Sequence, residues 1–342
     1  MIKRLGFDRY SALYLWAAFM LYFGITKNDT FISWTTFQLV FQENVFTAIL
    51  ALAFLVPMTT GAFDLSIGAQ MSMSLVLTAY FAEHQIMPAG LGAIIGILAC
   101  GIAGWISGFI VVKLKVNSFI ATLGMSQVIS AFIIHTSQQS INSPFSKEYM
   151  DFGAKPLFNL QRYFYMMIIL AVILWFVLEH TPIGRYMFAT GGNPEAARLS
   201  GVKTDRLVWG SLVVSGLIAG FAGTVYSWKV GNYDSSVGPG YLFPAVAAVF
   251  FGASQLKGRA NVWGSLIAVY ALAFGIWGLH LTFLNSIWID PLFQGLSLLI
   301  AVSIASRPAV VKITKRRAEA KAAAGEPPEE PIGGPSPAPE LR

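Results

Sequence analysis

The chain has 342 residues, of which 55% are hydrophobic and 12% charged, and its mean hydropathy is +0.62. A soluble domain has about 25% charged residues, so 23 Lys and Arg with 17 Asp and Glu are too few to cover a soluble protein of this length. This excludes a cytosolic enzyme and a disordered scaffold. One cysteine excludes a disulfide framework, and four scattered histidines argue against a metal cluster. We therefore expect an all-α membrane protein.

Ten apolar stretches set the expected layout. A helix needs about 20 mostly apolar residues to cross the hydrocarbon core of a bilayer, so the stretches predict a polytopic bundle of about ten transmembrane helices. They cover residues 10–26, 44–60, 65–82, 89–112, 119–138, 162–180, 207–228, 241–256, 261–281 and 288–306. Glycines four residues apart predict close approach of helices. Such pairs are Gly92 with Gly96, Gly104 with Gly108, and Gly216 with Gly220.

Lys and Arg set the expected orientation, because they concentrate on the cytoplasmic side of membrane proteins. With the N-terminus inside and ten alternating spans, the loops inside carry most of the basic residues. The inside set is Lys3, Arg4, Arg9, Lys113, Lys115, Arg185, Arg198, Lys203, Arg206, Lys257, Arg259 and Arg307, and the outside set is Lys27, Lys147, Lys155, Arg162 and Lys229. Both termini are therefore expected in the cytoplasm, with a retained first helix and not a cleaved signal peptide. Because the charge of +6 is spread over several loops, no nucleic-acid partner is expected.

The composition changes near the C-terminus. Residues 1–310 form the expected transmembrane domain, whereas residues 311–342 are rich in Pro, Ala and Glu. A segment of this kind buries too little apolar surface to offset the entropy of ordering, so we expect a disordered cytoplasmic tail. Its first basic residues, Lys315, Arg316 and Arg317, are expected to contact anionic membrane lipids.

A polar segment between the sixth and seventh stretches carries the clearest local signal. Asn193 suits the N-cap, Pro194 the first helical position, and Glu195 the first turn, where the helix dipole favours a carboxylate. Gly201 is a typical C-terminal stop. The residues between them that favour a helix are Ala196, Ala197, Arg198 and Leu199. We expect one short cytoplasmic helix, entered through a hinge at Gly191-Gly192, that docks on a partner or on the protein's own surface.

Four motifs follow one another along the membrane portion. They are Gly61-Ala62-Phe63-Asp64-Leu65-Ser66-Ile67-Gly68, then Phe119-Ile120-Ala121-Thr122-Leu123-Gly124, then Gly191-Gly192-Asn193 with Ala196-Ala197-Arg198-Leu199-Ser200-Gly201, and last Gly238-Pro239-Gly240-Tyr241 with Ala245-Val246-Ala247-Ala248-Val249 and Gly252. In this order they resemble the ribose/xylose-type sugar permeases of ATP-binding-cassette (ABC) importers, the binding-protein-dependent inner membrane components. The chain departs from the family at Leu242-Phe243-Pro244, where Glu-Leu-Asp is usual, which leaves the solute open.

The resemblance implies a permease subunit that moves a small sugar or polyol across the bacterial inner membrane and is not itself an enzyme. It implies that the short helix couples to a separate ATPase subunit. The coupling residues would be Gly191, Gly192, Asn193, Glu195, Ala196, Ala197, Arg198 and Gly201. It further implies a periplasmic binding protein at outer loops 139–160 and 229–243, and a second permease subunit, identical or closely related. The chain has no Gly-x-x-x-x-Gly-Lys-[Ser/Thr] loop, so ATP is expected to be used by the partner, with no cofactor in this chain.

Polar and aromatic residues within the apolar stretches are candidates for a solute path. An ionisable group at membrane depth is costly unless it faces a cavity or a partner, so Asp64 either orients a polar path or caps a helix that begins at Leu65. Polar groups can bind sugar hydroxyls and aromatic rings can stack on a sugar ring, although each also suits contacts between helices. The candidates are Asp64, Ser66, Gln70, Phe119, Thr122, Gln127 and Trp263.

Two further functions stay open at this point. One is an ABC permease for another solute, such as a branched-chain amino acid, a nucleoside or a signalling furanosyl compound. The other is a secondary transporter driven by an ion gradient, with Asp64 as its coupling carboxylate. An ion-driven carrier would take up solute alone, whereas an ABC permease would need its partner chains and ATP.

Overall fold

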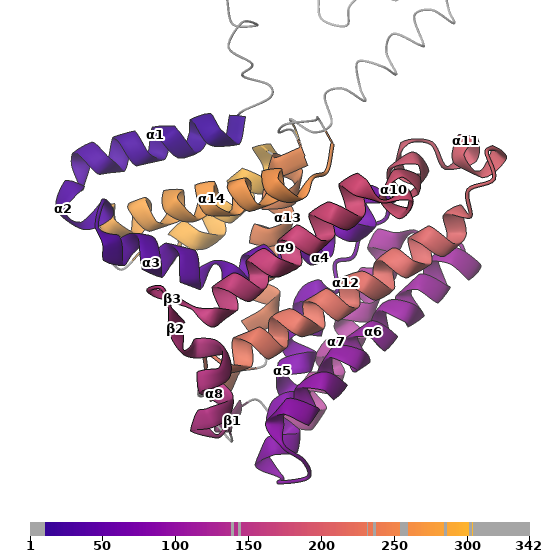
Figure 1. Cartoon of the computed structure of the whole chain (residues 1–342), viewed down its shortest axis with the longest axis horizontal. Helices are drawn as coiled ribbons and strands as arrows, with labels where there is room; N and C mark the ends of the chain where they lie inside the picture. The colour runs from indigo at the N-terminus through magenta and orange to yellow at the C-terminus, as the bar shows by residue number, and fades with distance from the viewer. Residues whose placement is uncertain are drawn as a thin grey trace, which may run out of the picture.

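The computed structural model describes residues 11–137, 140–142, 145–230, 232–234, 237–253, 259–283, 286–300 and 303. Within these ranges the chain is a helical bundle with two small two-stranded sheets (Figure 1). The expected all-α membrane fold is therefore confirmed. The expected tail at 311–342 and the N-terminal basic residues lie outside the described residues.

The elements follow the apolar stretches closely. The N-terminal half comprises α1 Ser11–Thr26, α2 Asn28–Phe31, α3 Trp34–Glu43, α4 Val45–Thr59, α5 Ile67–Glu83, α6 Ala89–Lys113, α7 Ser118–Ser137 and β1 Ser140–Asn142. The C-terminal half comprises α8 Lys147–Ala154, β2 Pro156–Leu157, β3 Leu160–Gln161, α9 Arg162–His180, α10 Pro182–Gly192, α11 Pro194–Leu199, α12 Thr204–Ser227, β4 Asn232–Asp234, α13 Val237–Ala253 and α14 Val262–Thr282. A last apolar helix covers Ile289–Ile300.

Each predicted stretch contains a helix, but the expected count of about ten transmembrane helices is not supported. Five helices in the described ranges, α6, α7, α9, α12 and α14, are long and apolar enough to cross a membrane. The bent pair of α3 and α4, with 40° between the two helices, makes a sixth. Helices α5 and α13 have 17 residues each, at the short end of the range for a crossing and shorter than any of these five. Both are largely buried in the protein, so their apolar composition reflects packing against other helices instead of contact with lipid.

Helix α4 forms the centre of the bundle. Nearly all of its side chains are buried, and it packs against α5, α9, α12, α13 and α14. A helix that is apolar on every side is stable only when it is enclosed. The sequence of α4, Val-Phe-Thr-Ala-Ile-Leu-Ala-Leu-Ala-Phe-Leu-Val-Pro-Met-Thr, has this character, and it explains why the other helices surround it.

Close approach between α6 and its neighbours depends on the predicted glycine pairs. A side chain at Gly104 would meet the backbone oxygen of Leu212 in α12, and one at Gly96 would lie 2.8 Å from the backbone oxygen of Ser74 in α5. Gly216 of α12 would in turn meet the backbone oxygen of Cys100 in α6. The spacing therefore correctly predicted helix crossings at which backbones touch.

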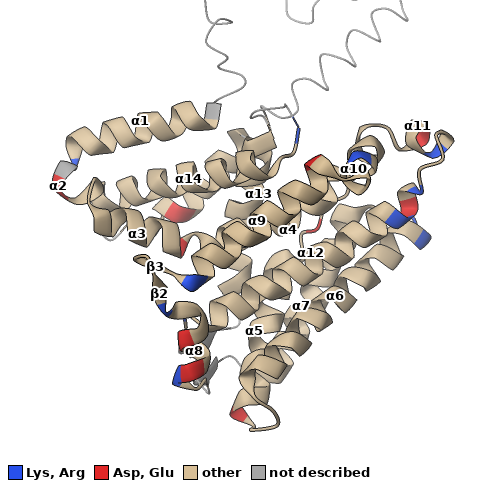
Figure 2. Ribbon diagram, viewed as in Figure 1, with Lys and Arg blue, Asp and Glu red and all other residues tan. Residues whose placement is uncertain are grey.

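Charged residues mark the two ends of the long helices. Figure 2 shows them gathered around α10, α11 and the nearby ends of α6 and α12, and again around α8 at the opposite end, while the middles of α6, α9 and α12 are free of charge. This separation is what a bilayer requires, because charges within the hydrocarbon are costly.

We expect Gly104→Ala to destabilise the protein by about 1–3 kcal/mol, because the added methyl group meets backbone that cannot move aside. Gly210→Ala is the matched control on α12, since a methyl group there meets nothing within 4 Å. The control is expected to keep or slightly raise stability, because Ala favours helix over Gly. Thermal unfolding of the detergent-solubilised variants measures both, and equal melting temperatures would contradict the crossing.

Candidate functional site

The short helix predicted in the polar segment is α11, Pro194–Leu199. The Asn193 side chain accepts a hydrogen bond from the backbone N–H of Ala196 at 3.1 Å, which is the predicted N-cap. Gly201 ends the segment with φ +84°, a left-handed conformation that favours glycine. Both ends of the helix were therefore correctly predicted.

Arg198 ties α11 to the start of α12. Its guanidinium donates to the Asp205 carboxylate at 2.9 Å and to the Thr204 hydroxyl at 3.2 Å. Lys115, just beyond α6, lies 3.8 Å from the other Asp205 oxygen. An exposed ion pair adds little stability, but this one fixes the direction of α11 relative to the two long helices.

The remaining surface of α11 faces outward. Of its side chains only Ala197 is buried, Glu195 is exposed, and Leu199 is 91% exposed. A single exposed leucine is common on protein surfaces, so the exposure of Leu199 does not by itself identify a contact. The sequence reasoning did not select Leu199 as a site residue, although its place at the end of the helix was visible.

The expected hinge at Gly191-Gly192 is wrong. Both glycines form the last turn of α10, Pro182–Gly192. A side chain at Gly191 would collide with the backbone oxygen of Thr59 and would lie 3.1 Å from the backbone nitrogen of Gly61. Gly191 is therefore needed for close packing of α10 on the end of α4, which only the tertiary structure reveals.

The chain breaks its helical structure between α4 and α5, at residues 60–66. Gly61 has φ +82° and begins the break. Asp64 is fully buried, and its Oδ1 accepts hydrogen bonds from the Ser66 backbone N–H at 3.0 Å and the Ser66 hydroxyl at 2.5 Å. Helix α5 begins at Ile67, two residues later than expected, so Asp64 holds the turn in front of the helix and is not its N-cap.

Helix α7 supplies partners for the rest of the break. The Thr122 hydroxyl accepts from the Leu65 N–H at 3.0 Å, and the Ser118 hydroxyl accepts from the Phe63 N–H at 3.0 Å. Thr122 in turn donates to the Ser118 carbonyl at 2.8 Å. A buried backbone N–H without a partner costs about 1–3 kcal/mol, so these two side chains hold the second motif against the first.

A polar cluster continues from the break into the bundle. The Gln70 amide donates to the Ser66 hydroxyl at 2.6 Å, and the Cys100 thiol donates to the Gln70 carbonyl at 3.0 Å. Three buried oxygens near α12, Asp64 Oδ2, Gln70 Oε1 and Ser215 Oγ, have no hydrogen bond in the part of the chain that the structure describes. Asp64, Ser66 and Gln70 are thus joined in one network, and Thr122 bonds to the backbone of the same break at Leu65.

The first and last motifs also meet. The backbone N–H of Gly238, at the start of α13, donates to the Ser72 hydroxyl of α5 at 2.9 Å. Gly68 and Gly238 lie so close that a side chain on either would collide with the other's backbone. Two short helices therefore begin at the same point inside the bundle.

The other predicted path residues lie elsewhere. Phe119 is 49% exposed and Gln127 is exposed, both on α7. Trp263, near the start of α14, packs its ring 6.2 Å from that of Trp175 in α9. None of the three side chains belongs to the hydrogen-bond network around Asp64; of Phe119, only the backbone carbonyl accepts from the Thr122 hydroxyl, at 3.4 Å.

The two loops predicted to lie outside, 139–160 and 229–243, meet through a small sheet, because β1 pairs antiparallel with β4. Beside it, the Tyr149 hydroxyl of α8 lies 2.8 Å from the Ser227 hydroxyl at the end of α12. Burial raises the pKa of the Tyr149 phenol. Among the described residues, no group of three His, Cys, Asp or Glu side chains is placed to hold a metal ion.

These features define a polytopic α-helical membrane protein with a buried polar network joined to an exposed short helix. Residues 39–302 match the family described as branched-chain amino acid transport system / permease component. The chain therefore belongs to this family of transport permeases, and the resemblance seen in the four motifs is confirmed.

Individual relatives match over most of their length. The fructose import permease protein of Rhizobium meliloti is 30% identical over 298 residues, covering 83% of this chain and 81% of that protein. The ribose import permease protein of Escherichia coli is 29% identical, with 78% and 84% covered. The D-allose transport system permease protein of the same organism is 26% identical, with 77% and 81% covered. The comparison with solved structures gave no significant match.

We expect Thr122→Val to destabilise the protein by about 2 kcal/mol, because it leaves the buried Leu65 N–H without an acceptor. Thr136→Val is the matched control on α7, since its hydroxyl bonds only to the Phe132 carbonyl of its own helix. Thermal unfolding in detergent distinguishes the two. If the two variants melt at the same temperature, α7 does not hold the break.

Proposed function

We propose that the chain is the transmembrane permease subunit of an ABC importer for a small sugar or polyol in the bacterial inner membrane. The family and the names of its relatives, which are import permeases for fructose, ribose and D-allose, support this proposal. The structural observation that carries it is α11, a capped helix on which Leu199 and Glu195 are exposed. Its Arg198 side chain bonds to Asp205 in the first turn of α12. Such a helix is suited to receive force from another subunit.

In this proposal a separate ATPase subunit binds α11 and hydrolyses ATP, and this chain holds no cofactor. The residues at that contact would be Gly192, Asn193, Glu195, Ala196, Ala197, Arg198 and Gly201, together with Leu199. Movement of α11 would pass through α10 to Gly191, which touches the end of α4 at Thr59. The break that follows contains Asp64, so the ATPase would act on the buried network through backbone contact.

The remaining partners would bind at the other surfaces. A periplasmic binding protein would deliver the solute to the loops that β1 and β4 join. A second permease subunit, identical or closely related, would cover the exposed face of α7, because Gln127 is too polar to face lipid. Phe119 and Gln127 would then border a path shared by the two subunits.

The Lys and Arg bias supports an orientation with both termini in the cytoplasm. The α10–α11 segment would then face the ATPase, and α8 the periplasm. The tail at 311–342 would lie in the cytoplasm with its basic start near anionic lipid.

Purification of the tagged chain in detergent from its native membrane, with mass spectrometry of the co-purified proteins, tests the proposal. We expect an ATPase with a nucleotide-binding loop. Recovery of the chain alone, together with solute uptake by the chain alone in liposomes under an ion gradient, would instead establish an ion-driven carrier.

We expect Glu195→Lys to reduce solute uptake and co-purification of the ATPase without loss of membrane insertion, because it reverses a charge on the exposed face of α11. Leu199→Asp should weaken the ATPase contact by about tenfold or more, since burial of a leucine contributes about 2 kcal/mol. Glu83→Lys, an exposed charge reversal at the end of α5, is the control. Unchanged uptake by both α11 variants would refute the coupling role.

We expect Gly191→Ala to lower uptake while the ATPase still co-purifies, because the methyl group separates α10 from Thr59 without altering α11. Gly210→Ala adds the same group in open space and should leave uptake unchanged. Transport assays paired with co-purification separate loss of transmission from loss of binding. Full uptake by Gly191→Ala would exclude transmission through this contact.

A further inference from the structure

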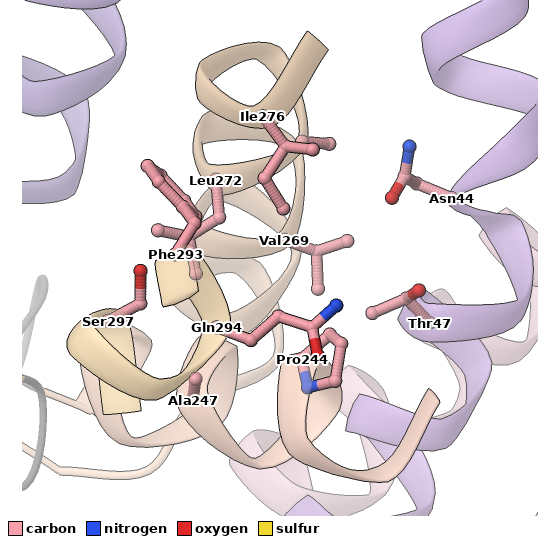
Figure 3. Close-up of a pocket in the computed structure, with 11 residues that line it drawn as sticks. Asn44, Thr47, Pro244, Ala247, Val269, Leu272, Ile276, Phe293, Gln294 and Ser297 are labelled. Carbon is pink, nitrogen blue, oxygen red and sulfur yellow. The ribbon is translucent and has the colours of Figure 1, made fainter. Parts of the chain in front are cut away.

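The pocket that α4, α13, α14 and the helix Ile289–Ile300 line is too small for a solute (Figure 3). The space inside it that a water molecule can enter is about 30 Å³, which is room for about one or two waters. The surface of the molecule carries a more distinctive feature. It is the hairpin that β2 and β3 form just before α9, beside α8 and α3 (Figure 1).

The hairpin turns through two residues, Phe158 and Asn159, because Leu157 pairs with Leu160. Both turn residues have positive φ, +47° for Phe158 and +67° for Asn159, as a type I′ turn requires. Asn tolerates this conformation, whereas a bulky residue such as Phe rarely adopts it. Phe158 is nevertheless 85% exposed. Packing within the described part of the chain therefore does not account for an aromatic residue at the tip.

Two side chains hold the tip in place. The Tyr165 hydroxyl of α9 donates to the Leu157 carbonyl at 2.9 Å, and the Gln38 amide of α3 donates to the Asn159 carbonyl at 2.7 Å. The hairpin is thus fixed against two helices by bonds to its backbone. Phe158 is exposed at a fixed position and not on a free loop.

The hairpin lies at the end of an apolar stripe on α9. This helix is long and apolar enough to cross a membrane, and little of it is buried in the protein. Its exposed apolar residues recur every three or four positions and so share one face, on which Tyr165 lies one turn before the first of them. They are Ile169, Val172, Ile173 and Phe176. An exposed apolar face on a spanning helix is suited to lipid, so the bond from Tyr165 places the hairpin where that lipid contact ends.

Aromatic and basic residues surround the tip, which is the composition of a membrane–water interface. Trp34 lies one turn before Gln38 on α3 and is 64% exposed. Lys155 and Arg162 flank the two strands, and the Arg162 N–H donates to the Lys155 carbonyl at 3.3 Å. Long basic side chains reach lipid headgroups, while aromatic rings lie between the headgroups and the hydrocarbon. A protein partner would leave the continuity with the α9 stripe unexplained.

We propose that the hairpin 156–161 is an anchor in the membrane–water interface, with Phe158 inserted among phospholipid headgroups and Leu157 beside it. The inference goes beyond the proposed function, because it depends on the membrane crossing of α9 and on neither the solute nor the ATPase. Either proposal can therefore fail while the other stands.

A spin label tests this placement in liposomes that contain the full-length chain, through its collisions with oxygen, which dissolves in lipid, and with a water-soluble nickel complex. The chain's one cysteine, Cys100, is buried and bonded to the Gln70 carbonyl, so the label attaches to an introduced cysteine. We expect the ratio of oxygen to nickel collisions at Phe158→Cys to exceed that at Glu148→Cys several-fold. Glu148 is an exposed position on α8 at the same end of the molecule. Ile173→Cys, on the α9 stripe, marks the value for lipid.

Each other outcome at Phe158→Cys overturns the proposal. A label as open to the nickel complex as the one at Glu148→Cys would place the hairpin in water. A label shielded from both reagents would place it in a contact with a second copy of the chain. Shielding that appears only when a periplasmic binding protein is added would assign the hairpin to that partner.

A label at Leu157→Cys tests whether Phe158 itself holds the hairpin in the interface. We expect Phe158→Asn to raise collisions of this label with the nickel complex several-fold, because Asn accepts positive φ and keeps the turn but does not favour the interface. Phe158→Trp should leave the collisions unchanged, since Trp favours the interface as well. Equal collisions in the original protein and in Phe158→Asn would show that Phe158 is not the anchor.

Discussion

Residues 60–66 leave the helical hydrogen-bond pattern, and all of them are buried except Gly61, which is exposed, and Phe63, which is half-buried. An unpaired N–H in such a place costs several kcal/mol in hydrocarbon, so the surrounding elements must supply acceptors. Within the break, the Asp64 carboxylate accepts a hydrogen bond from the Ser66 N–H. The Ser118 and Thr122 hydroxyls of α7 accept hydrogen bonds from the N–H groups of Phe63 and Leu65 in the break. The positions of α5 and α7 follow from this requirement.

The same break brings the exposed and buried parts of the molecule into contact. Gly61 and Thr59 border it on one side, and Gly191 of α10 rests on their backbones. Because Gly191 has no side chain between these backbones, a displacement of α10 would act on the break directly through backbone atoms. In the proposed importer this contact is where the movement of the ATPase would enter the membrane portion.

The polar network around Asp64 is only partly satisfied by hydrogen bonds. Asp64 Oδ1, the Ser66 hydroxyl and the Gln70 amide nitrogen bond to one another and hold the break in place. Among the described residues, Asp64 Oδ2, Gln70 Oε1 and Ser215 Oγ are buried without a hydrogen bond. A buried polar group without a partner is costly, so these side chains do not satisfy the network by themselves.

The sequence alone determined the membrane class, the helical segments, the capped helix from Asn193 to Gly201, and the glycines at helix crossings, because each depends on local composition or on spacing along one helix. Only the tertiary structure decided that α5 and α13 are short helices enclosed by longer ones, that Gly191 is a packing contact and not a hinge, and that Thr122 belongs with Asp64 while Phe119, Gln127 and Trp263 do not. Those outcomes join residues far apart in the chain. Apolar runs and short motifs carry no information on which distant backbone a glycine touches or which N–H a hydroxyl meets.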